Sequence, residues 1–216
     1  MLVLVVDTSS QAVTAAVVDV SGEPVVRGER VTLNARGHGE LLAPSIAAAL
    51  GGARASTSDL GAVVAGLGPG PYTGLRVGLV SAAVFADALG IPSYGVCSLD
   101  AIGDACRDDN ALLVATDARR KEVYWAKYAH GVRTEDPAVA PPADIDARDR
   151  TAIAGHGASL YDFGLPRRDV LYPPAVSLAR CARERIVTHA PSEVLVPMYL
   201  RRPDAVVPAA PKPVTP

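Results

Sequence analysis

The chain has 216 residues, of which 49% are hydrophobic and 5% aromatic, and its formal net charge at pH 7 is −2. A chain of this length can bury a sizeable core of valine, alanine and leucine, as one domain or two small lobes. The nearly balanced charge gives no electrostatic reason for the isolated chain to bind nucleic acid or an anionic membrane strongly.

The cysteines and the N-terminus narrow the class of protein further. Cys97, Cys106 and Cys181 are odd in number and widely spaced, which excludes a full disulfide framework and a CxxC motif, and we expect reduced thiols. The apolar run at residues 2–6 lacks the basic region and cleavage site of an export signal. No stretch approaches the length of a membrane span, so we expect a cytoplasmic protein without a membrane segment.

A three-stranded meander is predicted at the start of the chain, over residues 2–6, 13–18 and 25–33, because apolar runs there are separated by short polar turns. Asp7 stands at the tip of the first strand. Ser9 lies in the turn that follows, so the meander presents a carboxylate and a hydroxyl at one end.

A first helix is predicted from Glu40 or Leu41 to Leu50, because apolar residues recur on one face and Gly51 and Gly52 follow. Pro44 then falls in the first turn, where proline is tolerated. His38 stands at the entrance of this helix, and we interpret it as a cap or surface residue.

Residues 62–90 read as a buried strand, a loop rich in glycine and proline, and a helix that ends at Leu89. Such a loop before a helix N-terminus can hold a phosphate or carboxylate, or be a plain tight turn. Neither GxxxxGK[ST] nor GxGxxG fits, because Thr73 occupies the position where each motif needs glycine. The candidate anion cleft comprises Asp7, Ser9, Gly66, Gly68, Gly70 and Thr73, with Thr73 also the expected N-cap.

The helix after this loop is apolar nearly all round, since only Arg76, Ser81 and Asp87 are polar between residues 74 and 89. Small residues recur every four positions, which would let another backbone approach closely. Either the chain's own fold covers this helix on all sides, or one side meets a partner. We predict a partner, with Gly78 and Ala82 at the closest approach. The expected contacts are Leu41, Leu42, Ile46, Gly74, Leu75, Gly78, Leu79 and Ala82.

The second half of the chain repeats features of the first. Residues 5–18 and 115–128 share a strand, an aspartate, a turn and a strand, and AVVAGLG at residue 62 matches TAIAGHG at residue 151. Two echoes in the same order predict two similar α/β lobes. We place them at residues 1–98 and 99–202, with a last helix capped by Ser177 and a disordered tail at 203–216 rich in proline and alanine.

Four segments carry a family resemblance: VDTS near the start, GPGPYTGLRVG in the middle, DARRKEVYWA in the second half and PMYLRR near the end. Together they resemble the bacterial TsaB (YeaZ) family over roughly residues 1–202. The resemblance implies a duplicated actin-like fold, like that of sugar kinases and heat-shock chaperone ATPases. It also implies a part in making threonylcarbamoyladenosine next to the anticodon of tRNA.

In that system TsaB is the non-catalytic dimerisation subunit, the related subunit TsaD carries the metal and the transfer chemistry, and the ATPase subunit TsaE completes the complex. The resemblance therefore implies TsaD, TsaE and a second copy of the chain as partners, with tRNA reached only through the complex. It implies no tightly bound cofactor, although the complex uses ATP and a nucleotide could lie at a subunit interface.

The residues agree with a non-catalytic role. Catalytic relatives resemble HxEGHLLAP in the first helix, where two histidines four apart face a metal. When that motif is aligned with this chain on its LLAP at residues 41–44, the two histidine positions hold Arg36 and Glu40. We therefore expect neither a metal site nor a catalytic residue in this chain.

Two other functions remain as alternatives. An ATP-dependent phosphotransferase agrees with the fold and with Asp7, but the actin-like phosphate loop usually carries glycine two residues after that aspartate, and Ser9 stands there instead. A metallopeptidase is a weaker alternative, because the sequence contains no HExxH, GxSxG or Cys-His motif.

Overall fold

The computed structural model of the chain describes residues 1–34 and 37–201. Its first sheet has five strands in the order β3-β2-β1-β4-β5. β1 pairs antiparallel with β2 and parallel with β4, so the opening meander continues into a parallel crossover. The strands are β1 (Leu2–Asp7), β2 (Ala12–Asp19), β3 (Val25–Leu33), β4 (Leu60–Gly66) and β5 (Ser93–Val96).

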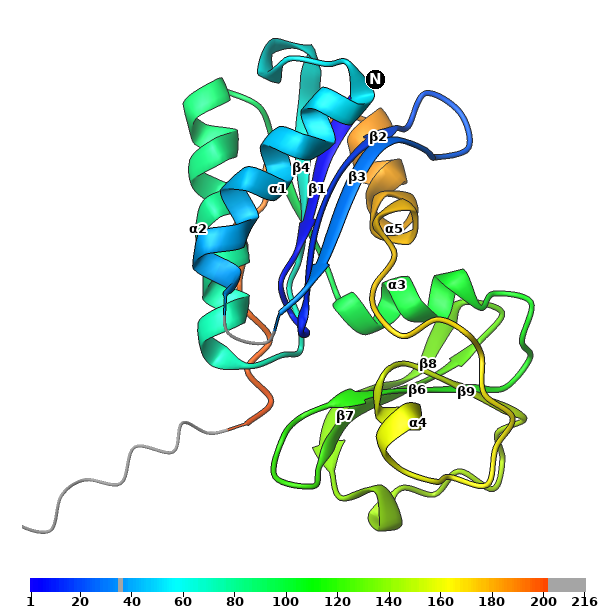
Figure 1. The fold of residues 1–216 in the computed structure, drawn as a ribbon. Coiled ribbons are helices and arrows are strands. Elements are labelled where there is room, and N and C mark those ends of the chain that lie inside the picture. Colours follow the sequence, from blue (N-terminus) through cyan, green and yellow to red (C-terminus); the bar gives the residue numbers. More distant parts are fainter. Residues whose placement is uncertain (35–36, 202–216) are drawn as a thin grey trace, which may run out of the picture.

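The second sheet repeats this topology with four strands, in the order β8-β7-β6-β9. In both sheets a strand that ends in aspartate pairs antiparallel with the next strand and parallel with a later one. The repetition confirms the two similar α/β lobes predicted from the sequence echoes (Figure 1). The strands are β6 (Leu112–Asp117), β7 (Val123–Ala129), β8 (Val132–Ala140) and β9 (Ala152–Ala154).

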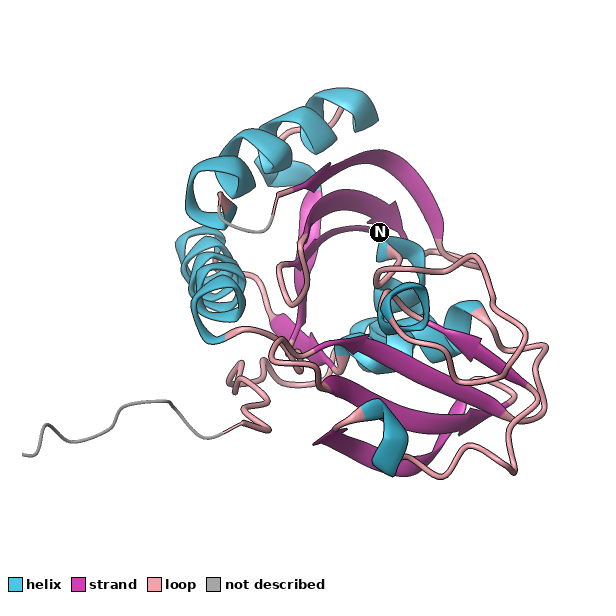
Figure 2. Ribbon diagram, turned by 60° about the horizontal axis from the view of Figure 1, so that its bottom comes forward, coloured by secondary structure: helices cyan, strands magenta, loops and turns pink. Residues whose placement is uncertain are grey.

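Helices cover both faces of the first sheet. α1 (His38–Ala53) and α2 (Tyr72–Leu89) lie along the outer side of this curved sheet, as Figure 2 shows, and α5 (Ala175–Val187) covers the opposite face. α3 (Ser98–Ala105) lies between the sheets, with Ala101 in the core of the first lobe and Leu99 and Ile102 in that of the second. Short helical turns complete the fold at Thr57–Asp59, Pro142–Asp144 and α4 (Gly157–Leu160).

The two faces of the first sheet explain why its strands are apolar throughout. In β1, Val3 and Val5 pack under α5, while Leu4 and Val6 pack under α1 and α2. A strand buried on both faces needs apolar side chains at every position, not at alternate ones.

α5 belongs to the packing of the first lobe, although it lies late in the sequence. Leu178, Ala179 and Ala182 are fully buried in the same cluster as β1 and β4. The division at residue 98 stays a prediction, and the structure adds that the chain returns to its first sheet near the end. The predicted tail at 203–216 lies outside the described residues, as does Arg36.

Three helix starts differ from the predictions. α1 begins at His38 and runs past Gly51 and Gly52 to Ala53, where Arg54 ends it in the left-handed conformation. α2 begins after Pro71, so Thr73 lies in its first turn and is not the N-cap. α5 begins after Pro174, two residues before the expected cap Ser177. In the last two cases proline fixes the backbone dihedral that a helix entrance requires, and no capping side chain is needed.

The expectation that no segment reaches membrane-spanning length is wrong for α2. By length and composition its 18 residues, with a mean hydropathy of 1.2, could cross a membrane. The core helix of a folded domain meets the same two criteria. One such helix is a weak indication of a membrane span, and α2 packs against β4, β1 and α1.

Candidate functional site

Asp7, at the end of β1, is turned into the protein and is only 1% exposed. Its carboxylate accepts hydrogen bonds from the backbone N–H of Ser9 at 3.0 Å and the Ser9 hydroxyl at 2.8 Å. The Ser98 hydroxyl donates a third at 2.6 Å from the start of α3. Burial raises the pKa of Asp7, although the bonds from Ser98 and Ser9 lower it.

The glycine-rich loop packs directly on this carboxylate. A Cβ on Gly66 would lie 1.8 Å from Asp7 Oδ2, and one on Gly70 would lie 2.1 Å from the carbonyl oxygen of Ser9. Gly68 donates its N–H to the Ser98 hydroxyl at 3.1 Å. These predicted cleft residues therefore lie together, and in the structure they contact one another.

Thr73 is the exception in this predicted cleft. It is exposed in the first turn of α2 and lines a separate cavity of about 350 Å³ with Thr8, Gln11 and His38. His38 was expected to cap the helix or face solvent, which is wrong. It is 9% exposed, and its Nε2 lies 2.8 Å from the carbonyl oxygen of Ser10, within hydrogen-bonding distance.

Little room remains between the β1–β2 and β6–β7 turns, which face each other across the two lobes. The cavity there, lined by Ser9, Asp117 and Arg119 among others, measures about 30 Å³. This volume suits one water molecule and not a phosphate chain. Gln11 also bridges the lobes, since its side-chain nitrogen lies 3.1 Å from His156 Nε2 and donates to the Tyr172 hydroxyl.

The predicted partner contacts occupy the chain's own core. Seven of them are buried, and Leu41 is half-buried against the same cluster. A Cβ on Gly78 would lie 2.2 Å from Thr8 Oγ1, which donates to the Gly74 carbonyl at 2.8 Å. The prediction that Gly78 and Ala82 meet a partner is therefore wrong, because the small stripe lets α2 approach its own β1–β2 turn. The buried residues are Leu42, Ile46, Gly74, Leu75, Gly78, Leu79 and Ala82.

The opposite sides of α1 and α2 carry exposed apolar residues that sequence reasoning did not select. Val80 and Val84 are 61% and 63% exposed. We call this surface the outer face; it comprises Ala43, Pro44, Ala47, Ala48, Val80, Ala83 and Val84. Among all exposed residues of the two helices only Glu40, Arg76 and Asp87 are charged. The i, i+4 spacing of Val80 and Val84 was the available signal.

The described residues offer few metal-ligating or nucleophilic groups beyond those discussed above. Within residues 1–34 and 37–201, no three His, Cys, Asp or Glu side chains lie close enough together to hold a metal. All three cysteines are free thiols, as expected. Burial raises the pKa of Cys97 and Cys181 to about 12 and that of Cys106 to about 11, so these thiols are poor nucleophiles at neutral pH.

Two α/β lobes of the same topology define the chain as a duplicated, actin-like protein. The TsaD sequence model, described as tRNA N6-adenosine threonylcarbamoyltransferase, matches residues 31–150. An uncharacterized protein of Mycobacterium tuberculosis is 51% identical over 203 residues, which cover 94% of this chain and 93% of that protein.

Two further relatives carry a family name. The tRNA threonylcarbamoyladenosine biosynthesis protein TsaB of Escherichia coli is 33% identical over 158 residues, or 68% of this chain and 66% of that protein. The solved structure of YeaZ from Pseudomonas aeruginosa superposes with a TM-score of 0.75 at 27% identity, covering 92% of this chain and 99% of that one. The chain belongs to the TsaB (YeaZ) family.

Proposed function

We propose that the chain is the non-catalytic partner subunit of a cytoplasmic complex that makes threonylcarbamoyladenosine in tRNA, binding a TsaD-type catalytic subunit through its outer face. The observation that carries the proposal is that face: two adjacent helices expose alanine, valine and proline where an isolated protein would expose charge. We infer a TsaD-type subunit as the partner because the chain belongs to the TsaB family.

The engaged, buried Asp7 carboxylate supports a role without nucleotide chemistry in this chain. A phosphotransferase of actin-like fold needs space between its lobes for phosphates and an acidic group directed there. Here the Asp7 carboxylate is only 1% exposed and is engaged by Ser9 and Ser98, so it is not directed into the space between the lobes. In the proposed complex ATP is consumed by a TsaE-type subunit, and tRNA is modified on the catalytic subunit.

The proposal is tested by placing charge on the outer face. The double variant Val80→Arg/Val84→Arg puts two long cations where the partner would lie, and desolvating them would cost several kcal/mol. Both positions are more than half exposed, so the variant should fold. We expect the wild type to co-elute with the catalytic subunit and the double variant to elute alone.

A matched control uses Val132→Arg, which changes an equally exposed valine, at 68%, at the start of β8 in the other lobe. It should co-elute with the catalytic subunit as the wild type does. Co-elution of the folded double variant at wild-type affinity would show that the interface lies elsewhere.

A further inference from the structure

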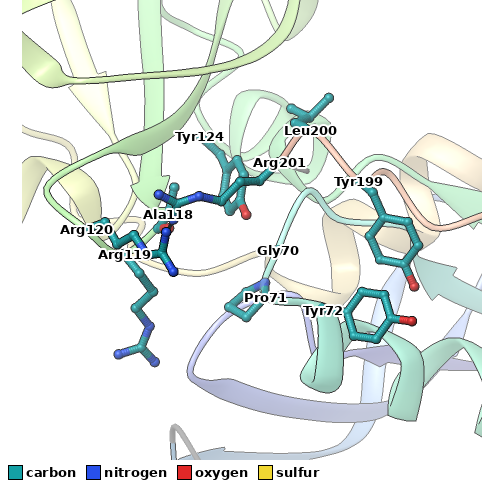
Figure 3. Close-up of a pocket in the computed structure, with 10 residues that line it drawn as sticks. All are labelled: Gly70, Pro71, Tyr72, Ala118, Arg119, Arg120, Tyr124, Tyr199, Leu200 and Arg201. Carbon is teal, nitrogen blue, oxygen red and sulfur yellow. Dashed lines mark hydrogen bonds between the residues drawn. The ribbon is translucent and has the colours of Figure 1, made fainter. Parts of the chain in front are cut away.

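A cavity of about 490 Å³ is lined by residues of both lobes and is used by none of the roles described above (Figure 3). Three parts of the chain form it: the entrance of α2, the β6–β7 turn and the segment that ends at Arg201. Its lining includes three arginines and no acidic residue, although the whole chain is slightly acidic. The lining residues are Gly70, Pro71, Tyr72, Ala118, Arg119, Arg120, Tyr124, Tyr199, Leu200 and Arg201.

One wall of the cavity is a fixed aromatic pair. The rings of Tyr72 and Tyr199 stack with centroids 5.0 Å apart and planes 26° from parallel. Arg76 holds both, since its guanidinium carbon lies 4.1 Å from the Tyr72 centroid and its Nε donates to the Tyr199 hydroxyl at 2.8 Å. Tyr72 and Tyr199 as whole residues nevertheless remain 48% and 39% exposed. Aromatic rings already fixed in position lose little side-chain freedom when another planar group stacks on them.

The opposite wall is basic, and its backbone has a conformation that residues other than glycine adopt at a cost. Arg119, Arg120 and Lys121 all have positive φ, at 64°, 53° and 63°. Glycine or asparagine would adopt this turn at lower cost, so three long cations stand here against the backbone preference. Arg119 and Arg120 line the cavity on this side, facing the tyrosine pair across Pro71 (Figure 3).

Acidic neighbours only partly offset this charge. The Arg119 side chain is 56% exposed, with its Nε 3.7 Å from Asp117 Oδ2. Arg201 is engaged more closely, by Glu122 at 2.8 Å and the Ala118 carbonyl at 2.9 Å. The cavity therefore combines partly exposed tyrosines with arginines in its lining.

We propose that this cavity binds one nucleotide of a single-stranded RNA segment, with the base against Tyr72 and Tyr199 and the flanking phosphates on Arg119 and Arg120. Base stacking on aromatic side chains beside a basic groove is how proteins bind single strands without base-specific hydrogen bonds. Arg119 lines the side of the cavity away from the tyrosine pair and its side chain is 56% exposed, so a strand that continues past the stacked base can place a phosphate on it. The inference rests on the proposed function, which supplies tRNA as the RNA.

The test measures binding of a fluorescently labelled, single-stranded RNA heptamer of mixed sequence to the full chain by anisotropy. We expect saturable binding with a Kd on the order of 100 µM at 50 mM salt. About two or three phosphate contacts should weaken binding roughly tenfold at 200 mM salt. AMP at the same concentrations should not displace the heptamer.

Two variants with matched controls locate the site. Tyr199→Leu removes a stacking ring and should weaken binding roughly tenfold. Its control is Tyr161→Leu, which changes a tyrosine packed on the second-lobe cluster around Leu113 and should leave binding unchanged. Arg119→Asn removes a cation while keeping a residue that tolerates positive φ, and should weaken binding several-fold. The control Arg54→Asn also replaces an exposed arginine of positive φ, here 53°, but at the end of α1, and it should leave binding unchanged.

The same four variants are also tested for co-elution with the catalytic subunit, which separates this inference from the proposed function. Loss of RNA binding with normal co-elution supports the cavity as the RNA contact. The inference is overturned if the heptamer does not bind up to 1 mM, if AMP displaces it, or if Tyr199→Leu binds like its control. Failure of all proteins to co-elute, with RNA binding intact, would instead overturn the proposed partner.

Discussion

At the scale of single residues, Asp7 shows how a side chain typical of a nucleotide cleft can serve the fold. Its carboxylate joins the β1–β2 turn to the start of α3 through Ser9 and Ser98, and Gly66 leaves room for it. A buried carboxylate is tolerated because three donors replace its water, yet burial still raises its pKa. Stability should therefore depend on pH at this residue.

The pH dependence of unfolding tests this account of Asp7. Since its folded-state pKa is raised, its contribution to the free energy of unfolding is fully present below the unfolded value of 3.8 and is lost as pH rises through the folded pKa. The Asp7→Asn variant does not titrate. We expect the stability of the wild type relative to Asp7→Asn to fall from pH 4 to pH 7 in urea titrations.

Asp59 gives the control of opposite sign. Hydrogen bonds from Ser56 lower its pKa, so the wild type should gain stability relative to Asp59→Asn as pH rises from acid. A wild-type advantage over Asp7→Asn that grows with pH would contradict the inward, desolvated carboxylate.

The thiols give a second prediction at this scale. Because burial raises the pKa of Cys97, Cys106 and Cys181 well above neutrality, a thiol-specific reagent at pH 7.5 should modify the folded chain slowly and the denatured chain completely. Mass spectrometry of both reactions measures this. Rapid modification of the native protein at any of the three would mean that its thiol is accessible.

At the scale of elements, α2 presents two sides with different roles. Its glycine side lies against the β1–β2 turn, while its valine side faces outward. The sequence predicted β1 to β4, β6, β7 and β9, and it also predicted the apolar character of α2. Periodicity alone could not tell which side of α2 faces inward, because a stripe of small residues suits a close approach to any neighbour.

The same limit applies to the candidate site. The residues of the predicted anion cleft, apart from Thr73, do come together, because they flank the ends of neighbouring strands. Which way the Asp7 carboxylate turns depends on Ser98, which is distant in sequence and lies at the start of α3. The cavity beside Tyr199 likewise depends on how the final segment returns to α2, which no local pattern reveals.

Paired glycine substitutions test the orientation of α2. Gly78→Ala gains about 1 kcal/mol of helix propensity. The added Cβ would lie 2.2 Å from Thr8 Oγ1, and moving Thr8 away to relieve this overlap costs about 1–3 kcal/mol. It also breaks the Thr8 bond to Gly74, so the variant should lose roughly 1–2 kcal/mol of unfolding free energy.

Gly51→Ala is the matched control in α1, where nothing lies within 4 Å of the added Cβ. It should gain about 0.5–1 kcal/mol, since only the helix propensity changes. Chemical denaturation measures both variants. Equal and favourable effects at the two positions would mean that Gly78 faces open space.

At the scale of the whole molecule, two similar lobes bury the Asp7 carboxylate, and the exposed chemistry lies on the outer face and in a cavity that both lobes line. The outer face of α1 and α2 is apolar, and the cavity beside Tyr72 and Tyr199 is aromatic and basic. Both surfaces suit contact with other macromolecules better than conversion of a small substrate.

Metal content is a prediction at this scale. Because Glu40 occupies the register of one histidine of the catalytic relatives, and the described residues form no cluster of metal-ligating side chains, elemental analysis after dialysis should find less than stoichiometric zinc or iron. The catalytic subunit prepared in parallel is the positive control. One tightly held transition metal per chain would assign this protein a catalytic or structural metal site.

The most direct test of the central claim is the formation of threonylcarbamoyladenosine on tRNA from supplied threonylcarbamoyl-adenylate, with and without the catalytic subunit. The account predicts product when the wild-type chain and the catalytic subunit are combined, and none from the chain alone. It predicts a loss of at least tenfold with Val80→Arg/Val84→Arg and wild-type yield with Val132→Arg. Product formed by this chain alone, or full activity of the folded double variant, would contradict it.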